Sequence, residues 1–240
     1  MFKSSMSIPD GWLDFSPYGK PIQNTRIIAT KSPMRKEFGL EKAKELTPTL
    51  LVDRLHQDGY TLGHVIDLTF TDRYYSPQEF RHLGVGHQKV KVPGKEIPGD
   101  DIFAQFSVAL NNFLSDKTKD GQFVAVHCTH GINRTGYLIC RYLIEKNGMS
   151  AESSIRAFNQ ARGHEIENKE YVEKLKRIYP GKKASPPPRA SASASLGGGH
   201  SPSAYCLHGT QHHGIHKKVK KHVTADIALK AYQELKLKKL

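Results

Sequence analysis

The sequence predicts an α/β fold with a central, mainly parallel sheet flanked by helices. Short apolar stretches of strand length alternate along the chain with longer stretches whose apolar residues recur at helical spacing. The alternation ends near Pro180, where the composition changes abruptly to small, polar and basic residues. We therefore expect one folded domain over residues 1–180 of this 240-residue chain, followed by an extension.

Three segments are typical of short buried strands. They cover residues 26–30, 64–70 and 122–127, and each is rich in β-branched or other apolar side chains. Helical segments separate them, which favours parallel pairing, since parallel strands need long crossover connections. The third segment leads directly into the most informative part of the chain.

Capping residues mark the expected helices. Thr47 and Pro48 form a good N-cap and first-position pair, followed by leucines up to Gly59. Asp100 and Asp101 open a second helix, whose apolar residues continue to Leu114. After the third strand we expect three further helices, at Tyr137–Lys146 (closed by Asn147-Gly148), around Ser150–Arg162 and at Lys169–Tyr179.

Residues 181–240 differ from the rest in composition. Residues 181–222 are of low complexity and predict a disordered linker, because they contain too little apolar surface to fold. Residues 223–240 predict a short amphipathic helix; a nascent helix without a fixed partner is the alternative. The segment 181–240 contains eleven lysines and arginines but only two acidic residues, Asp226 and Glu234, within a chain of net charge +13.

The basic tail predicts a polyanionic partner such as nucleic acid. Solubility and nuclear targeting through Lys217–Lys221 are equally good explanations. Cys206 and the histidines up to His216 resemble a set of zinc ligands, but they lack regular spacing, so we expect no metal there. Three cysteines without a regular pattern suit a reducing compartment, and we expect neither a membrane span nor a secretory signal.

The segment Val124–Gly136, with the sequence VAVHCTHGINRTG, places a cysteine where an apolar strand ends and a helix begins. In such a loop the backbone N–H groups and the helix dipole form an anion site. The same field should lower the pKa of the Cys128 thiol below its free value of about 8.5. Arg134 offers a planar fork for phosphate oxygens. The alternative is a buried structural thiol. It does not explain why Gly131, Arg134 and Gly136 all stand at the expected spacing after Cys128.

The pattern His-Cys-x5-Arg-Thr resembles the signature of cysteine-based phosphatases. The fuller sequence HCTHGINRTG resembles a narrower branch, the RNA 5'-triphosphatase domains of metazoan capping enzymes and the RNA/RNP-complex-interacting phosphatases. Ile8–Trp12, Val65–Tyr75 and Gly136–Ile144 also match the latter, so that the resemblance covers roughly residues 7–180. It implies a dual-specificity phosphatase-like fold. No nucleotidyl-transferase motif accompanies it, because Thr118 stands where that motif has lysine.

The loop and the resemblance together imply a mechanism. Cys128 would attack the terminal phosphorus and form a cysteinyl-phosphate, which water then hydrolyses, without metal or cofactor. Arg134 would stabilise the phosphoryl oxygens, and Thr135 would help the sulfur to leave. We expect the substrate to contact the loop residues Thr129, His130, Gly131, Ile132 and Asn133, together with Arg73 and Arg162 at the rim of the pocket.

A general acid is harder to assign. In this superfamily it is an aspartate on a separate loop upstream of the cysteine, where this chain has Asp100 and Asp101. Both look better placed to cap a helix, so Asp101 would be a weak acid at most. Asp67 at a strand end is the second candidate, and bracing the loop is an equally good role for it. A phosphate leaving group needs less protonation than a phenolate, which favours phosphoanhydride substrates.

The resemblance therefore predicts an enzyme that removes the γ-phosphate, and then the β-phosphate, from 5'-triphosphorylated RNA. A protein phosphatase acting on tyrosine, serine or threonine is the alternative, and an RNA-binding adaptor with a vestigial pocket is a third hypothesis. The predicted partners are triphosphorylated RNA and, through the basic tail, RNA-processing or ribonucleoprotein proteins. The predicted location is the nucleus, with the cytoplasm as the alternative.

Overall fold

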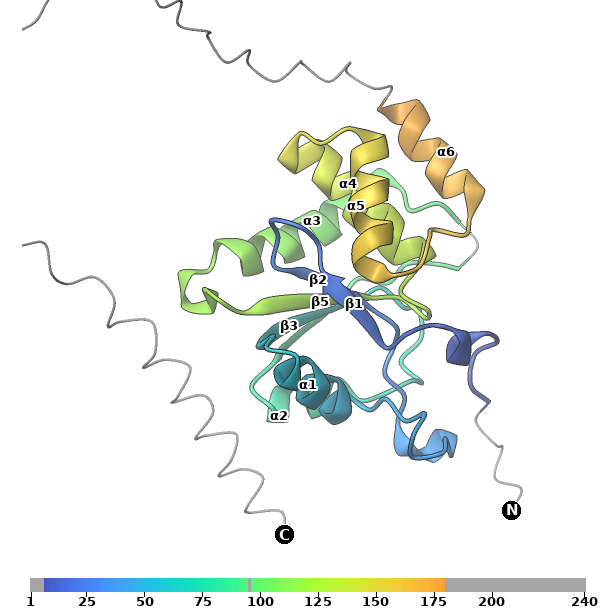
Figure 1. Ribbon diagram of the computed structural model, residues 1–240, viewed down its shortest axis with the longest axis vertical. Helices are drawn as coiled ribbons and strands as arrows, with labels where there is room; N and C mark the ends of the chain where they lie inside the picture. The colour runs from blue at the N-terminus through green and yellow to red at the C-terminus, as the bar shows by residue number, and fades with distance from the viewer. Residues whose placement is uncertain (1–6, 95, 180–240) are drawn as a thin grey trace, which may run out of the picture. The chain divides into compact units, whose positions relative to one another are not determined.

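The computed structural model describes residues 7–94 and 96–179, which form a five-stranded sheet with helices on both faces (Figure 1). The strand order is β1-β2-β5-β3-β4. Only β1 runs antiparallel to its neighbour, and the other pairs are parallel. The strands are β1 (Tyr18–Pro21), β2 (Ile27–Thr30), β3 (Leu62–Asp67), β4 (Gly86–Lys89) and β5 (Phe123–His127). The predicted mainly parallel α/β fold is confirmed.

Two apolar cores lie on the two faces of the sheet. One contains the buried faces of α3 to α6, and the other lies beneath α1 and α2 (Figure 1). The central strand β5 contributes to both cores because its side chains alternate between the faces. The helices are α1 (Pro48–Gln57), α2 (Pro77–His82), α3 (Asp100–Ser115), α4 (Asn133–Asn147), α5 (Ala151–Arg162) and α6 (Lys169–Ile178), with short 3₁₀ turns at Trp12–Asp14, Lys36–Phe38 and Lys117–Lys119.

The three predicted strands and five predicted helices are all present, with shifted ends. The largest shift is at α4, which begins at Asn133 rather than Tyr137, so that its first turn lies inside the signature loop. The N-cap of α3 is Gly99, and Asp100 and Asp101 occupy its first turn rather than the cap. Thr47 caps α1 as expected, accepting a hydrogen bond from the Leu50 amide at 3.2 Å.

Strands β1 and β4 and helix α2 were not predicted. Both strands lie at the edges of the sheet, and their side chains are only partly buried, so they lack the apolar pattern of a core strand. The predicted linker at 181–222, the helix at 223–240, the cysteine–histidine cluster and the basic cluster all lie outside the described residues. No helix within residues 7–94 and 96–179 is long and apolar enough to cross a membrane.

Candidate active site

The loop between β5 and α4 is a tight cradle at the carboxyl end of the central strand. His127 ends β5, Cys128 follows it, and Ile132 is the N-cap of α4. Gly131 has a φ of +71°, and a Cβ atom there would lie 2.0 Å from the Thr30 carbonyl oxygen, so only glycine fits. The chain can therefore turn closely against β2 and direct the loop amides inward.

Cys128 lies at the bottom of this cradle with 3% of its surface exposed. Burial alone would raise the pKa of its thiol. The Arg134 charge, the Thr135 hydroxyl and the amides of Thr135 and Ile132 outweigh burial, so the net direction is downward. The Thr135 hydroxyl is buried and has no other hydrogen-bond partner among the described residues, and it acts to lower the pKa of the Cys128 thiol.

The guanidinium of Arg134 is fixed by backbone carbonyls from the loops that follow two other strands. Its Nη1 donates to the Val92 carbonyl at 2.9 Å and to the Leu68 carbonyl at 3.4 Å. Its Nη2 donates to the Thr129 hydroxyl at 3.0 Å. The loops that follow β3 and β4 thus hold the cation in place beside Cys128, which reduces the ordering needed when an anion binds.

The structure corrects the predicted position of Arg162. We expected it at the rim in contact with substrate, but it is 1% exposed and lies behind the loop. Its Nε donates to the Gly131 carbonyl (3.2 Å) and its Nη2 to the His130 carbonyl (3.1 Å), while Nη1 and Nη2 hold Ser16. Burial lowers its pKa to about 10. Arg162 therefore supports the loop through the Gly131 and His130 carbonyls.

The other predicted loop residues are together around Cys128, but two of their side chains turn outward. His130 Nε2 donates to the Asp10 carbonyl at 2.8 Å, and its ring lies 5.2 Å from that of Phe15. The Asn133 side chain accepts from the Asn168 amide at 2.9 Å. These residues present backbone amides to the cradle, while their side chains fasten it to the N-terminal segment and to α6.

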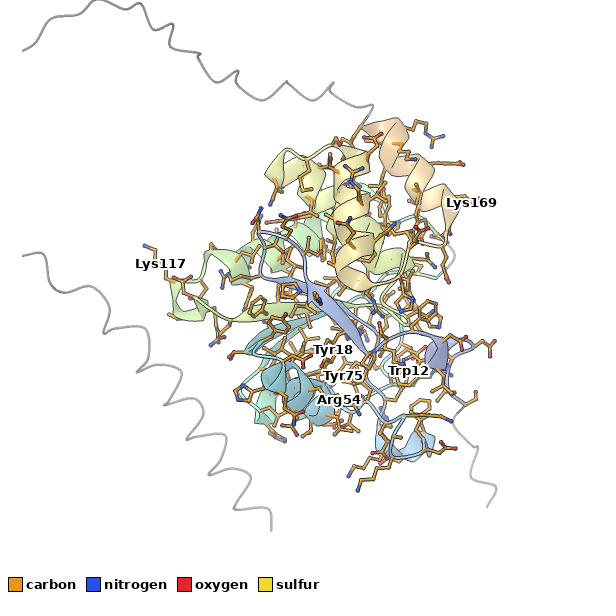
Figure 2. The ribbon with its side chains drawn as sticks, viewed as in Figure 1. Trp12, Tyr18, Arg54, Tyr75, Lys117 and Lys169 are labelled. Carbon is orange, nitrogen blue, oxygen red and sulfur yellow. The ribbon has the colours of Figure 1, made fainter. Side chains whose placement is uncertain are left out.

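Figure 2 labels two residues of the segments that hold the loop, Trp12 and Lys169. Trp12 and Lys169 lie toward one side of the domain, and Lys117, which precedes β5, lies toward the opposite side. Lys169, the first residue of α6, is next to Asn168 and hence to the loop. A cavity of about 370 Å³ lies at the other end of the sheet, and none of its lining residues was predicted to act in the site.

Asp67 is part of a buried network that favours its ionised form. Its Oδ1 accepts from the Thr69 amide and hydroxyl, each at 2.7 Å, and its Oδ2 accepts from Lys89 Nζ at 3.0 Å. Burial acts to raise its pKa, but His127, Lys89 and the Thr69 hydrogen bonds outweigh it, and the net direction is downward. An ionised carboxylate cannot protonate a leaving group, so the bracing alternative fits.

Tyr75 links this network to the loop. Its hydroxyl lies 3.1 Å from Asp67 Oδ2, 3.0 Å from His87 Nε2 and 2.7 Å from His127 Nε2. His127 Nδ1 in turn donates to the Cys128 carbonyl at 3.0 Å. Burial lowers the pKa of His127, which keeps it neutral near pH 7. Tyr74 and Tyr75 are thus core residues.

The remaining predicted residues lie at the surface. Asp101 is exposed in the first turn of α3, and its neighbour Asp100 pairs with Arg141 at 2.5 Å. Arg73 is exposed on the loop after β3, with its guanidinium 5.2 Å from the ring centre of Tyr74. Among the described residues, no contact joins the side chain of Asp101 or of Arg73 to the cradle.

Sequence reasoning missed Lys31 and Lys89. Lys31 is buried, and its Nζ donates to the carbonyls of Trp12 and Phe15 at 2.9 and 2.8 Å. Burial lowers its pKa to about 8, and the Arg162 charge acts in the same direction. The available signal was position: each lysine directly follows or ends a strand whose carboxyl end faces the site.

The family model for the dual-specificity phosphatase catalytic domain matches residues 51–179, more than half of the chain. The chain belongs to the dual-specificity phosphatase family. It is 39% identical over 175 residues to the human RNA/RNP complex-1-interacting phosphatase. The match covers 72% of this chain and 53% of that protein. The chain spans about half the length of such mammalian relatives.

Two shorter relatives are covered more fully. The Caenorhabditis elegans RNA/RNP complex-1-interacting phosphatase homolog is 39% identical over 173 residues, covering 70% of this chain and 74% of that protein. The tyrosine-protein phosphatase of Autographa californica nuclear polyhedrosis virus is 36% identical over 168 residues, covering 70% and 98%. These matches confirm the resemblance that the sequence motifs indicated.

Solved structures agree on the fold. The crystal structure of PTPMT1 in complex with PI(5)P has a TM-score of 0.51 and 20% identity, covering 69% of this chain and 96% of that one. The active form of Tk-PTP also has a TM-score of 0.51 and 20% identity, covering 68% and 97%. At this identity the likeness concerns the dual-specificity phosphatase fold alone.

Proposed function

We propose that this chain is an RNA 5'-phosphatase, which removes the γ-phosphate and then the β-phosphate of triphosphate-ended RNA. The Cys128 thiolate attacks the terminal phosphorus, and the bond from that phosphorus to the bridging oxygen breaks, which releases diphosphate-ended RNA. Water then attacks the cysteinyl-phosphate, the sulfur–phosphorus bond breaks, and inorganic phosphate leaves. A second round on the diphosphate end leaves a monophosphate.

The cradle supplies what this reaction needs. The lowered pKa of Cys128 provides the nucleophile, and the Arg134 fork beside it balances the charge that grows on the phosphoryl oxygens. Thr135 is placed to stabilise the sulfur as it departs in the second step. All of these groups belong to the protein, so the proposal requires no metal.

The observation that carries the choice of substrate is the state of the carboxylates that were candidates for the proton donor. Asp67 is ionised and bound to Lys89, Asp100 is paired with Arg141, and Asp101 is exposed. A phenolate or alkoxide must be protonated as it leaves, since the pKa of Tyr is about 10. A phosphate group, with a second pKa of about 6, leaves without such help. This arrangement supports cleavage of a phosphoanhydride, and the RNA in the relatives' names supports an RNA end.

Product analysis tests the proposal. RNA carrying a labelled γ- or β-phosphate is incubated with the protein and with Cys128→Ser, in the presence of a metal chelator. We expect the γ-label and later the β-label to appear as inorganic phosphate with the unaltered protein only. A requirement for divalent metal, or equal release by Cys128→Ser, would contradict the mechanism.

A protein tyrosine phosphatase is the second candidate, because the viral relative carries that name. It would depend on a proton donor, and Asp101 is the carboxylate that remains for that role. Under this alternative, Asp101→Asn should lower kcat on a phosphotyrosine peptide by 100-fold or more, since general acid catalysis contributes about 10² to 10⁴. Under the RNA proposal, the same substitution should change release from triphosphate RNA by less than about twofold.

We also propose a nuclear location, on the basis of the basic cluster Lys217–Lys221. A fluorescent fusion of the chain should accumulate in the nucleus. Replacing the four lysines of this cluster by glutamine should redistribute it.

A further inference from the structure

Phe70 is the most exposed large apolar side chain in the described part of the domain, at 60% exposure. Single exposed apolar residues are common on proteins and need no function by themselves. The position of Phe70 on the loop after β3 is the reason to consider a function for it. The other large apolar side chains that are exposed within residues 7–94 and 96–179 are Leu13, Val108 and Ile178.

Phe70 lies on the loop after β3, at the edge of the phosphate cradle. The carbonyl of Leu68, two residues earlier, accepts the hydrogen bond from Arg134 Nη1. Because consecutive residues advance the chain by at most about 3.6 Å, the backbone of Phe70 lies within about 7 Å of that of Leu68. Phe70 is thus carried on the loop that borders the site.

The loop on both sides of Phe70 is held in place. Thr69 donates its amide and hydroxyl to Asp67, and the Thr71 carbonyl accepts from Lys89 Nζ at 2.5 Å. A ring presented from a fixed backbone loses little entropy when a flat partner stacks on it. The exposed ring can therefore contact a bound ligand at a fixed position relative to Arg134.

Basic residues lie on the same loop and at the end of β4. Arg73 and Lys91 are exposed. Lys89 pairs with Asp67 and Asp72 at 3.0 and 2.9 Å, and Lys91 lies 4.0 Å from Asp72, so these three cations outnumber the two carboxylates. An aromatic ring beside an excess of positive charge is the combination that binds single-stranded nucleic acid, where bases stack and phosphates pair with cations. A peptide substrate would not require both.

We infer that Phe70 stacks on the first nucleobase of a triphosphate-ended RNA while the terminal phosphate is held by the Cys128 loop. The inference rests on the proposed RNA 5'-phosphatase function and adds a residue that binds the nucleoside. Every base has a π-face, so one stacking ring favours RNA ends over inorganic polyphosphate without selecting the identity of the first base. Phe70 acts on substrate binding and takes no part in bond breaking.

Two substrates separate this role from others. Short 5'-triphosphorylated RNA contains a base, and inorganic tripolyphosphate offers the same phosphoanhydride without one. We expect Phe70→Ala in the full chain to raise KM for the RNA about tenfold with kcat unchanged, and to leave KM for tripolyphosphate within about twofold. Phe70→Tyr should restore the KM for RNA. Val108→Ala, which removes a similarly exposed apolar side chain from α3, should change neither value.

Three results would overturn the inference. An unchanged KM for RNA in Phe70→Ala would remove the stacking role and leave the proposed function intact. An equal rise in KM for both substrates would mean that Phe70 shapes the phosphate pocket instead. If the unaltered protein releases phosphate from neither substrate, the proposed function fails, and the assignment of Phe70 fails with it.

Discussion

At the scale of single residues, the site depends on how a buried sulfur is kept ionised. Burial alone would keep Cys128 protonated, and the opposing groups are one cation, one hydroxyl and two amides. Of these, the Thr135 hydroxyl is the easiest to remove without altering the shape of the loop. Cys140 gives the contrast within the same chain, because it is also buried and there burial outweighs the Ser154 hydrogen bond and raises the pKa of its thiol.

We expect Thr135→Val to raise the pH at which Cys128 ionises. Losing a hydrogen bond to a charged group costs about 1.5–3 kcal/mol, which corresponds to roughly one to two pH units. The direction is upward because the hydroxyl stabilises the thiolate and not the thiol. Alkylation of Cys128 by iodoacetamide across a pH series, followed by mass spectrometry of its peptide, measures the midpoint. Thr135→Ser, which keeps the hydroxyl, is the matched control; an unshifted midpoint in Thr135→Val would assign the effect to Arg134 and the amides.

The sequence was informative about Cys128, Arg134 and Thr135 because their relationship is local. Six positions of loop and helix fix where the cation and hydroxyl lie relative to the sulfur. Arg162 was assigned to the rim because burial of an arginine is decided by contacts far along the chain, here with Ser16, 146 residues away. Asp67 was ambiguous for the same reason, since its lysine partner arrives from another strand.

At the scale of elements, the segment before β1 is part of the loop's support. Trp12 is fully buried, its Nε1 donates to the Ser32 carbonyl at 3.0 Å, and Lys31 Nζ lies 3.7 Å from its ring centre. Ser32 in turn donates its amide to the Thr129 carbonyl in the loop at 3.0 Å. The sequence match of Ile8–Trp12 assigned no role to this segment, and the contacts of Trp12 and Ser32 supply one.

Trp12→Ala should destabilise the domain by about 3–5 kcal/mol, because it removes a large buried ring and leaves a cavity. Leu13→Ala, one position along, removes a side chain that is 43% exposed and should cost less than about 1 kcal/mol. Urea denaturation of both variants measures the difference. Similar small losses in the two variants would mean that the segment does not support the fold.

Packing between elements also explains why the sequence pattern predicted some strands and not others. β2, β3 and β5 are largely buried, and their apolar runs revealed them. β1 includes Gly19 and Pro21, residues that disfavour strands in general. Gly19 is needed because a Cβ there would lie 2.3 Å from the Ala161 carbonyl oxygen of α5. This requirement comes from packing against another element, and no local pattern encodes it.

At the scale of the whole molecule, charge is distributed unevenly along the chain. The basic excess of residues 181–240 follows a domain that carries the proposed chemistry. We propose that this segment adds sequence-independent attraction for the RNA backbone, which releases counterions and therefore depends on salt.

Ending the chain at Ser185, shortly after the described residues end, tests this. We expect kcat on a short triphosphate RNA to be unchanged, and the affinity for a long RNA to fall at low salt. The plot of log affinity against log salt should also become less steep, in proportion to the number of RNA phosphates that the tail neutralises. A full-length variant with Lys217, Lys218, Lys220 and Lys221 replaced by glutamine controls for length. An identical salt slope in all three proteins would show that the tail does not bind RNA.

The way Arg134 is held also bears on when catalytic competence arises during folding. Its carbonyl partners are 66 and 42 residues away in the chain, on loops that follow two different strands. Contacts of such large sequence separation require long chain segments to close first, which slows their formation relative to helical turns. A refolding chain should accordingly regain its helical signal before it regains turnover. The Arg134 guanidinium therefore reaches its position beside Cys128 only after β3, β4 and β5 have paired.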